Sequence, residues 1–194
     1  MHRLVLATRN AHKTHEFAQI LGAEFAVSDL ASFRESARVD ETGATFVENA
    51  ILKAVAVSQQ IAELVVADDS GLEVDALGGA PGIYSARYAG ARASDAENVA
   101  KLLDELARCD ADARGARFRC ALALAREGKV LGIFEGVVEG TIVRTPRGSA
   151  GFGYDPVFQP AGLTQTFAEL LPADKNRISH RARAIELLRA ALLA

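Results

Sequence analysis

Apolar residues near the N-terminus form short continuous runs, and a longer segment with helical spacing lies between two of them. Residues 4–7 and 65–67 are continuous apolar runs of the kind found in buried strands. From 45 to 64 apolar residues recur at helical spacing, and Thr45 with Glu48 has the sequence pattern of a capping box. This part of the chain is therefore expected to alternate strand, helix and strand.

The rest of the chain predicts paired strands followed by a terminal helix. Alternating apolar residues predict strands at 72–77, 118–124 and 130–143, with Gly128 in the turn between the last two. Helical spacing predicts helices that begin near 15 and that cover 96–106 and 178–193. This order favours an α/β fold with a mixed sheet. No repeat or low-complexity linker divides the sequence, so a single domain over residues 1–194 is expected.

The composition argues against nucleic acid polymers and membranes as binding partners. The chain has 22 Lys and Arg against 25 Asp and Glu, a formal net charge of -3, which gives no general attraction to nucleic acid polymers or anionic membranes. No apolar stretch approaches the roughly 20 residues that span a bilayer, and the first apolar run is too short for a signal peptide. Cys109 and Cys120 lack the spacing of a zinc site, which favours reduced thiols in a cytoplasmic protein.

The turn after the first apolar run is a candidate phosphate site. A strand that leads through a polar turn into a helix directs backbone N–H groups and the helix dipole at the turn. Thr8 and Asn10 would add neutral hydrogen bonds there, and Lys13 would add charge. The alternative, a capped helix start with a surface lysine, remains open because the glycines of a phosphate-binding loop are missing.

An acidic pair follows the second apolar run. Asp68 and Asp69, followed by Ser-Gly, would lie at the carboxyl edge of the sheet, where α/β proteins commonly bind ligands. Mg²⁺ prefers oxygen ligands and often takes only one or two carboxylates. Asp69 is a candidate ligand and Glu41 a second one. A turn with capping aspartates explains the pair about equally well.

Aromatic and basic residues near the C-terminus form the last two candidate groups. The segment 152–155 could stack a base on its aromatic side chains and bind the nucleoside through its carboxylate, although both aromatics could instead fill the core. The densest cationic cluster comprises Lys175, Arg177, His180, Arg181 and Arg183. A solvated basic face is the alternative for Arg177 and Arg183.

Five stretches carry a resemblance to a known family: LATRNAHK (6–13), ETGATFVENAILKA (41–54), ADDSGLEVDALGGAPGIYSARYAG (67–90), GFGYDPVF (151–158) and SHRARA (179–184). They follow one another from the first expected strand to the last helix, so the resemblance covers nearly the whole chain. On these motifs the sequence resembles the inosine triphosphate pyrophosphatase family, whose members remove deaminated purine nucleotides. Arg9 departs from the pattern, since many relatives have a small residue there.

The resemblance implies an elongated mixed β-sheet with flanking helices, in two lobes around a nucleotide cleft, a homodimer and dependence on Mg²⁺. It implies hydrolysis of ITP, dITP and XTP to the monophosphate and pyrophosphate. The positions matching the family's phosphate contacts are Thr8, Asn10, Lys13, Lys53 and Ser70, with the backbone of Arg9, Ala11 and His12. The positions matching its metal ligands are Glu41 and Asp69. The positions matching its nucleoside and purine contacts are Phe152, Gly153, Tyr154, Asp155, Lys175, His180 and Arg181.

In the implied reaction, Asp69 or Asp68 activates a water that attacks the α-phosphorus. Donors from His180 and Arg181 would meet the 6-oxo group of the purine. Two other functions are open at this stage: a pyrophosphatase for modified pyrimidine triphosphates and a nucleotide sensor without turnover. The SHR and FGYD motifs argue against the first, and the intact Glu41 and Asp69 argue against the second.

Overall fold

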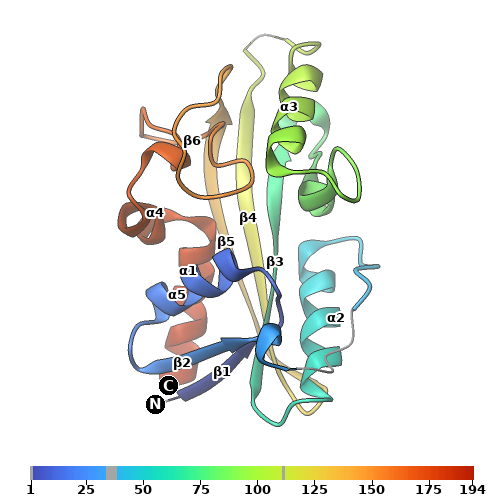
Figure 1. The fold of residues 1–194 in the computed structure, drawn as a ribbon, viewed down its shortest axis with the longest axis vertical. Coiled ribbons are helices and arrows are strands. Elements are labelled where there is room, and N and C mark those ends of the chain that lie inside the picture. Colours follow the sequence, from blue (N-terminus) through green and yellow to red (C-terminus); the bar gives the residue numbers. More distant parts are fainter. Residues whose placement is uncertain (1, 34–38, 111) are drawn as a thin grey trace. The chain divides into compact units, whose positions relative to one another are not determined.

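The computed structural model describes residues 2–33, 39–110 and 112–194. Its strands form a six-stranded sheet in the order β2-β1-β3-β4-β5-β6 (Figure 1). β1 pairs in parallel with β2 and β3, whereas β5 and β6 are antiparallel. The expected mixed sheet is therefore confirmed. The strands are β1 (His2–Leu6), β2 (Phe25–Asp29), β3 (Leu64–Val74), β4 (Gly115–Arg126), β5 (Lys129–Ile142) and β6 (Phe158–Pro160).

The helices begin where local side chains satisfy their first N–H groups. Thr45 accepts a hydrogen bond from the N–H of Glu48 at the start of α2, and Ser94 with Glu97 forms a reciprocal capping box at the start of α3. The α-helices are α1 (Ala11–Leu21), α2 (Phe46–Ser58), α3 (Asp95–Leu106), α4 (Pro172–Ile178) and α5 (His180–Leu193). Short 3₁₀ helices lie at Leu30–Ser32, Asp75–Leu77, Gly82–Arg87 and Phe167–Glu169. In the described part of the chain, no helix is both long and apolar enough to cross a membrane.

The chain divides into two compact units. The first comprises Met1–Asp69, Cys120–Gly136 and Arg181–Ala194. Its core joins one face of the strands to α1 and α5, and α2 lies on the other side of β3 (Figure 1). The buried residues of this core are Leu4, Leu6, Phe17, Leu21, Phe25, Val66, Cys120, Leu122, Leu124, Ala184, Ile185 and Leu188.

The second unit comprises Ser70–Arg119 and Val137–His180 and has a core of its own. Aromatic rings dominate it: Phe118 lies edge-on to Phe158 and stacks on Phe167. Tyr154 is part of the same core, at 4% exposure. β3, β4 and β5 each continue from one unit into the other.

Several elements differ from the sequence-based prediction. α1 begins at Ala11 rather than near 15, and the strand expected to reach 77 ends at Val74. β3 runs without interruption through Asp68 and Asp69, where we expected the first strand to end and a second to begin at 72. α2 ends at Ser58 rather than near 64. The C-terminal helix expected at 178–193 is α5, which begins at His180 because Ser179 has extended backbone angles (φ -66, ψ 157), and α4 precedes it without having been predicted. The nucleotide cleft that the resemblance implies stays a prediction.

Candidate functional site

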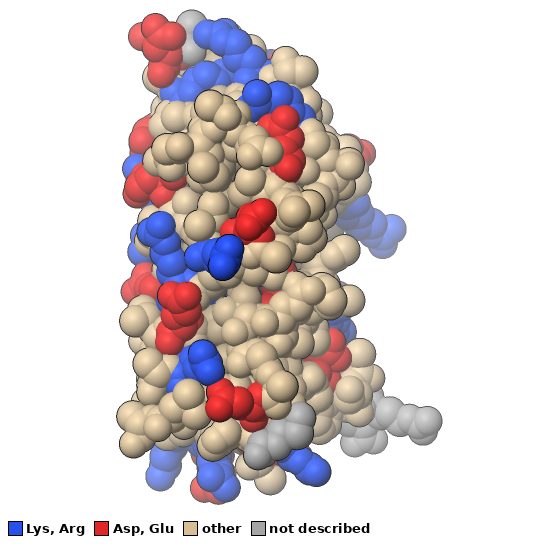
Figure 2. Space-filling view, turned by 90° about the vertical axis from the view of Figure 1, so that its left-hand side faces the viewer, with Lys and Arg blue, Asp and Glu red and all other residues tan. Residues whose placement is uncertain are grey.

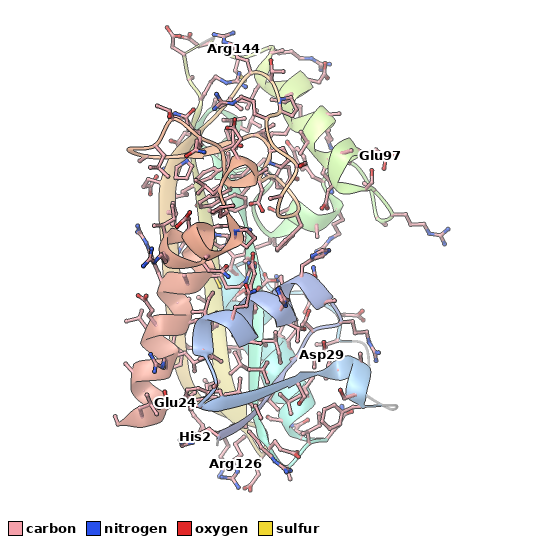
Figure 3. All side chains as sticks on the ribbon, turned by 60° about the vertical axis from the view of Figure 1, so that its left-hand side comes forward. His2, Glu24, Asp29, Glu97, Arg126 and Arg144 are labelled. Carbon is pink, nitrogen blue, oxygen red and sulfur yellow. The ribbon has the colours of Figure 1, made fainter. Side chains whose placement is uncertain are left out.

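The turn between β1 and α1 is shaped by its own polar side chains. Asn10 caps α1, accepting hydrogen bonds from the N–H groups of His12 (3.0 Å) and Lys13 (3.3 Å). Thr8 Oγ1 accepts from the N–H of Asn10 at 3.1 Å. Asp29 of β2 accepts from Thr14 Oγ1 at 2.8 Å, beside the same turn (Figure 3). The expected helix start is thus present, and Arg9 and Ala11 beside it are exposed residues.

Asp68 is buried between two cations. Its Oδ1 accepts from Lys13 Nζ, and its Oδ2 accepts from Arg181 Nε at 2.8 Å. Burial alone would raise the pKa of Asp68, but Arg181 and Lys13 outweigh it and hold that pKa well below its ordinary value. Asp68 is therefore a carboxylate that stays ionised and acts as an acceptor.

Two buried residues that the sequence did not single out complete this network. Glu16 Oε2 accepts from Arg181 Nη1 at 2.5 Å, and Cys120 Sγ donates to Asp68 Oδ2 at 3.4 Å. Burial, and then the neighbouring Asp68, raises the pKa of the Cys120 thiol well above its ordinary value, so it remains protonated. Only the spacing of Glu16, one helical turn after Lys13, could have pointed to it.

Asp69 lies in a second network, centred on Lys53 of α2. The Lys53 ammonium donates to Glu41 Oε1 (2.9 Å), to Asp69 Oδ1 (2.8 Å) and to the carbonyl oxygen of Asp68 (2.9 Å). Asn49, one turn earlier on α2, donates to Asp69 Oδ2 at 3.3 Å. Burial lowers the pKa of Lys53, but Asp69 and Glu41 outweigh it, so the pKa is raised and Lys53 stays charged.

The two neighbouring aspartates thus have opposite environments. Successive residues of a strand point to opposite faces of the sheet, so Asp68 reaches the residues of α1 and α5, and Asp69 reaches α2. Burial raises the pKa of Asp69, and Lys53 only partly offsets this. Carboxyl groups whose pKa values are pushed apart in this way can take different roles, and Asp69 is the one suited to exchange a proton.

The residues around Lys53 fit a divalent cation. Glu41 and Asp69 already share one positive charge, the Lys53 ammonium, between their oxygen atoms. Among the described residues, no group of three or more His, Cys, Asp or Glu side chains could hold a metal alone. Mg²⁺ commonly binds through one or two carboxylates and completes its coordination with water and substrate phosphates. The carboxylate oxygens of Glu41 and Asp69 match this way of binding Mg²⁺.

In the second unit, Asp155 organises the loop that carries the aromatic residues. Its Oδ2 accepts from the N–H of Phe152 (2.9 Å) and from Lys175 Nζ (2.7 Å), and both charged side chains of this pair are buried. Lys175 Nζ also lies 4.9 Å from the centre of the Phe152 ring. Gly151 has a left-handed φ of 76°, and a Cβ there would lie 2.0 Å from the Asp155 carboxylate. The loop therefore holds an aromatic ring beside an ammonium group.

The remaining candidates in this unit take different positions. The Tyr154 hydroxyl donates to the carbonyl of Ser85 at 2.9 Å from within the core, so Phe152 is the more exposed of the two loop aromatics. The N–H of Gly153 donates to Asp95 at 2.6 Å. His180 is buried and stacks on Phe118, with ring centres 4.7 Å apart. Ser70 is half-buried in β3, directly after Asp69.

Known proteins resemble the chain over its whole length. The dITP/XTP pyrophosphatase of Geobacillus kaustophilus is 51% identical over 191 residues, which are 97% of this chain and 93% of the relative. The dITP/XTP pyrophosphatase of Bacillus subtilis is 48% identical and covers 97% of this chain and 96% of its own length.

Solved structures also resemble the chain over nearly its whole length. A HAM1 protein from Coxiella burnetii superposes with a TM-score of 0.90 at 44% identity, covering 100% of this chain and 99% of its own. A nucleoside-triphosphatase / dITP/XTP pyrophosphatase from Mycobacterium abscessus gives a TM-score of 0.77 at 42% identity, covering 96% of this chain and 98% of its own. A family model described as the Ham1 family matches residues 4–191. On these matches, which span nearly every residue, the chain belongs to the Ham1 family.

Proposed function

We propose that this protein is a nucleoside triphosphate pyrophosphatase that hydrolyses non-standard purine nucleotides such as dITP, ITP and XTP to the monophosphate and pyrophosphate. The observation that carries the proposal is the Asp69 carboxylate, whose pKa is raised and which shares the Lys53 ammonium with Glu41. In this group Asp69 is the proposed base, Lys53 is a donor for the phosphates, and the carboxylates of Glu41 and Asp69 are ligands for a metal ion. The names of the relatives at 51% and 48% identity support the same substrate class.

In this proposal Asp69 accepts the proton of the water that attacks the α-phosphorus. A base works best when its pKa is near the working pH, and burial moves Asp69 in that direction. Asp68 is unsuited to this role because Lys13 and Arg181 hold its pKa low. We therefore assign proton acceptance to Asp69, and to Asp68 the placement of Lys13.

Lys13 and Lys53 are the cations proposed to stabilise the phosphates and the leaving pyrophosphate. Thr8, Asn10 and the backbone of residues 9–12 would bind the triphosphate at the start of α1, where the helix dipole favours an anion. Ser70 is proposed as a further phosphate contact. We propose that Glu41 and Asp69 hold Mg²⁺, which when bound polarises the phosphoryl oxygens and lowers the pKa of bound water.

For the purine, we propose that Phe152 provides the stacking surface. Asp155, Gly153 and Tyr154 hold the loop of Phe152, Lys175 supplies a donor beside its ring, and His180 is proposed as a second donor. Hypoxanthine and xanthine have a 6-oxo acceptor, whereas adenine has an amino donor that would leave such donors unpaired. A hydrogen bond from Arg181 to the 6-oxo group of the purine stays a prediction, because Arg181 Nε and Nη1 donate to Asp68 and Glu16.

A substrate panel tests the proposal. Purified protein with Mg²⁺ is incubated separately with dITP, XTP, GTP, ATP and dTTP, and products are resolved by ion-exchange chromatography. We expect dIMP or XMP with pyrophosphate, little turnover of GTP, ATP and dTTP, and loss of activity with a chelator that added Mg²⁺ reverses. Diphosphate with orthophosphate, or equal turnover of ATP and dITP, would contradict the proposal.

We also propose a homodimer, a single pyrophosphatase domain over residues 1–194 and a cytoplasmic location. Three strands that run through both compact units support one domain. The thiols of Cys109 and Cys120 are free, as is typical of a reducing compartment. Figure 2 shows acidic and basic side chains interspersed along the visible face, which favours a small-molecule substrate over a nucleic acid polymer.

A further inference from the structure

The loop that carries Phe152 is restrained differently on its two sides. Gly151 and Gly153 flank this residue, and both have left-handed φ angles, 76° and 61°. Packing is tight around Gly151, since a Cβ there would lie 2.0 Å from the Asp155 carboxylate. Apart from its chain neighbours, no described residue has a heavy atom within 4 Å of a Cβ added at Gly153. Packing therefore restrains the chain before Phe152, whereas that side of Gly153 is open.

A hydrogen bond from outside the loop restrains Gly153. The N–H of Gly153 donates to Asp95 Oδ2 at 2.6 Å, and the N–H of Phe152 donates to Asp155 Oδ2 at 2.9 Å. The two peptide groups that meet at the Cα atom of Phe152 are thus each bound to a carboxylate. Because φ and ψ of Phe152 are the two soft torsions between these planar groups, holding both groups fixes the direction in which the ring leaves the backbone.

Asp95 belongs to a firmly anchored helix. It is the first residue of α3, which packs into the core of the second unit through residues that include Leu102 and Leu106. The capping box of Ser94 and Glu97 fixes the start of the helix, and Figure 3 labels Glu97 there. Asp95 itself is exposed. A carboxylate on a fixed helix holds a loop more precisely than one on another loop, so Asp95 is well placed to restrain Gly153.

We infer that Asp95 is a positioning residue that holds the Phe152 ring in the direction required to stack on the purine base. This inference rests on the proposed function, because it assigns Asp95 to base binding through Phe152. An anion in the first turn of a helix is also stabilised by the helix dipole, which is a purely structural explanation for Asp95. That explanation applies equally to Glu97, whose carboxylate binds Ser94. It does not account for a bond to a loop 58 residues away.

Substitutions at Asp95 and Glu97 separate the two explanations. Asp95→Ala removes the acceptor for Gly153, so KM for dITP should rise by about five- to tenfold while kcat stays within about twofold of wild type. Asp95→Asn loses the charge but keeps an acceptor oxygen, and should recover most of the wild-type KM. Glu97→Ala is the matched control, because it removes an anion and a cap from the same turn of α3. It should lower the melting temperature and leave KM unchanged.

A double-mutant cycle tests whether Asp95 acts through the ring. In Phe152→Leu there is no ring to hold, so adding Asp95→Ala should raise KM by less than about twofold further. Competitive inhibitors give a second, independent measurement. The inhibition constant of dIMP, which contains the base, should rise in Asp95→Ala together with KM. The inhibition constant of inorganic tripolyphosphate, which has no base, should stay at its wild-type value.

The outcomes separate this inference from the proposed function. A rise in KM for Asp95→Ala that Asp95→Asn reverses, that Glu97→Ala lacks and that Phe152→Leu masks supports the inference. An unchanged KM in Asp95→Ala, an equal rise in Glu97→Ala, or effects of Asp95→Ala and Phe152→Leu that simply multiply would overturn it. In each of these cases, hydrolysis of dITP by the wild-type protein leaves the proposed function intact. A wild-type protein that neither hydrolyses dITP nor binds dIMP overturns both.

Discussion

Arg181 Nε donates to Asp68 Oδ2 at 2.8 Å, although 113 residues separate them in the sequence. The bond joins the first turn of α5 to the middle of β3. Because Lys13 binds the other oxygen of Asp68 and Glu16 binds the same Arg181, α1 contributes both ends of this network. Its two cations and two anions balance in a buried environment. The network thereby fixes Lys13 at the helix start where we propose that phosphate binds.

Replacement of Asp68 should therefore destabilise the fold. Asp68→Asn leaves Arg181 and Lys13 with one carboxylate fewer in a buried site, and we expect a loss of about 3–5 kcal/mol in the free energy of unfolding at pH 7. The measurement is urea unfolding followed by circular dichroism. Asp174→Asn, an exposed aspartate on α4, should change the value by less than about 0.5 kcal/mol.

This difference should also depend on pH. The pKa of Asp68 is lower in the folded than in the unfolded state, so the ionised group contributes stability above its unfolded pKa of about 3.9 and loses it as the pH falls through the folded pKa. The gap between wild type and Asp68→Asn should be full at pH 7 and should narrow below about pH 4. A gap that widens on acidification would refute the assignment of Asp68 as an ionised, paired group.

Asp69→Asn should abolish most turnover while leaving the fold intact. The amide keeps the shape of the side chain but cannot accept the proton of the attacking water, so kcat should fall by about 10²–10⁴-fold. Steady-state release of pyrophosphate from dITP measures the change. A kcat within twofold of wild type would remove Asp69 from the role of base.

Lys53→Met should shift the pH dependence of the reaction. Lys53 lowers the pKa of Asp69, so its removal raises that pKa, and Asp69 becomes ionised only at higher pH. The acid limb of the kcat/KM profile should move upward by about one pH unit. Lys101→Met, on the exposed surface of α3, should leave the limb in place. An unmoved limb in Lys53→Met would show that another group controls it.

Phe152→Leu should weaken substrate binding more than chemistry. Stacking of a base on an aromatic ring contributes about 1–3 kcal/mol, so KM for dITP should rise by about 5- to 150-fold with little change in kcat. Tyr84→Leu, which removes a ring that is 57% exposed elsewhere in the second unit, is the control. A fall in kcat at constant KM would instead place Phe152 in the chemical step.

Local patterns were sufficient for elements whose cause is local. The two-residue turn after β4 has positive φ at Glu127 (52°) and Gly128 (75°), as a tight hairpin requires, and the glycine indicated it. The helix α2 follows a cap that is visible in the sequence, at Thr45, whereas the cap of α3, Ser94, had not been singled out. The mixed sheet followed from the order of these elements.

Features that depend on distant partners could not be predicted in this way. Two adjacent aspartates indicate a turn unless cations from elsewhere compensate them inside a strand. In β3 those cations are Lys13, Lys53 and Arg181, which no local window contains. For the same reason no local pattern indicates that Arg181 lies between Asp68 and Glu16. Tyr154 could equally have faced a ligand, and its place in the core depends on packing.

The most direct test of the central claim follows the oxygen of the attacking water. Hydrolysis of dITP is run in H₂¹⁸O with Mg²⁺, and the products are analysed by mass spectrometry. Attack at the α-phosphorus predicts one ¹⁸O atom in dIMP and none in pyrophosphate. Label in the pyrophosphate, or release of labelled orthophosphate with dIDP, would contradict the account.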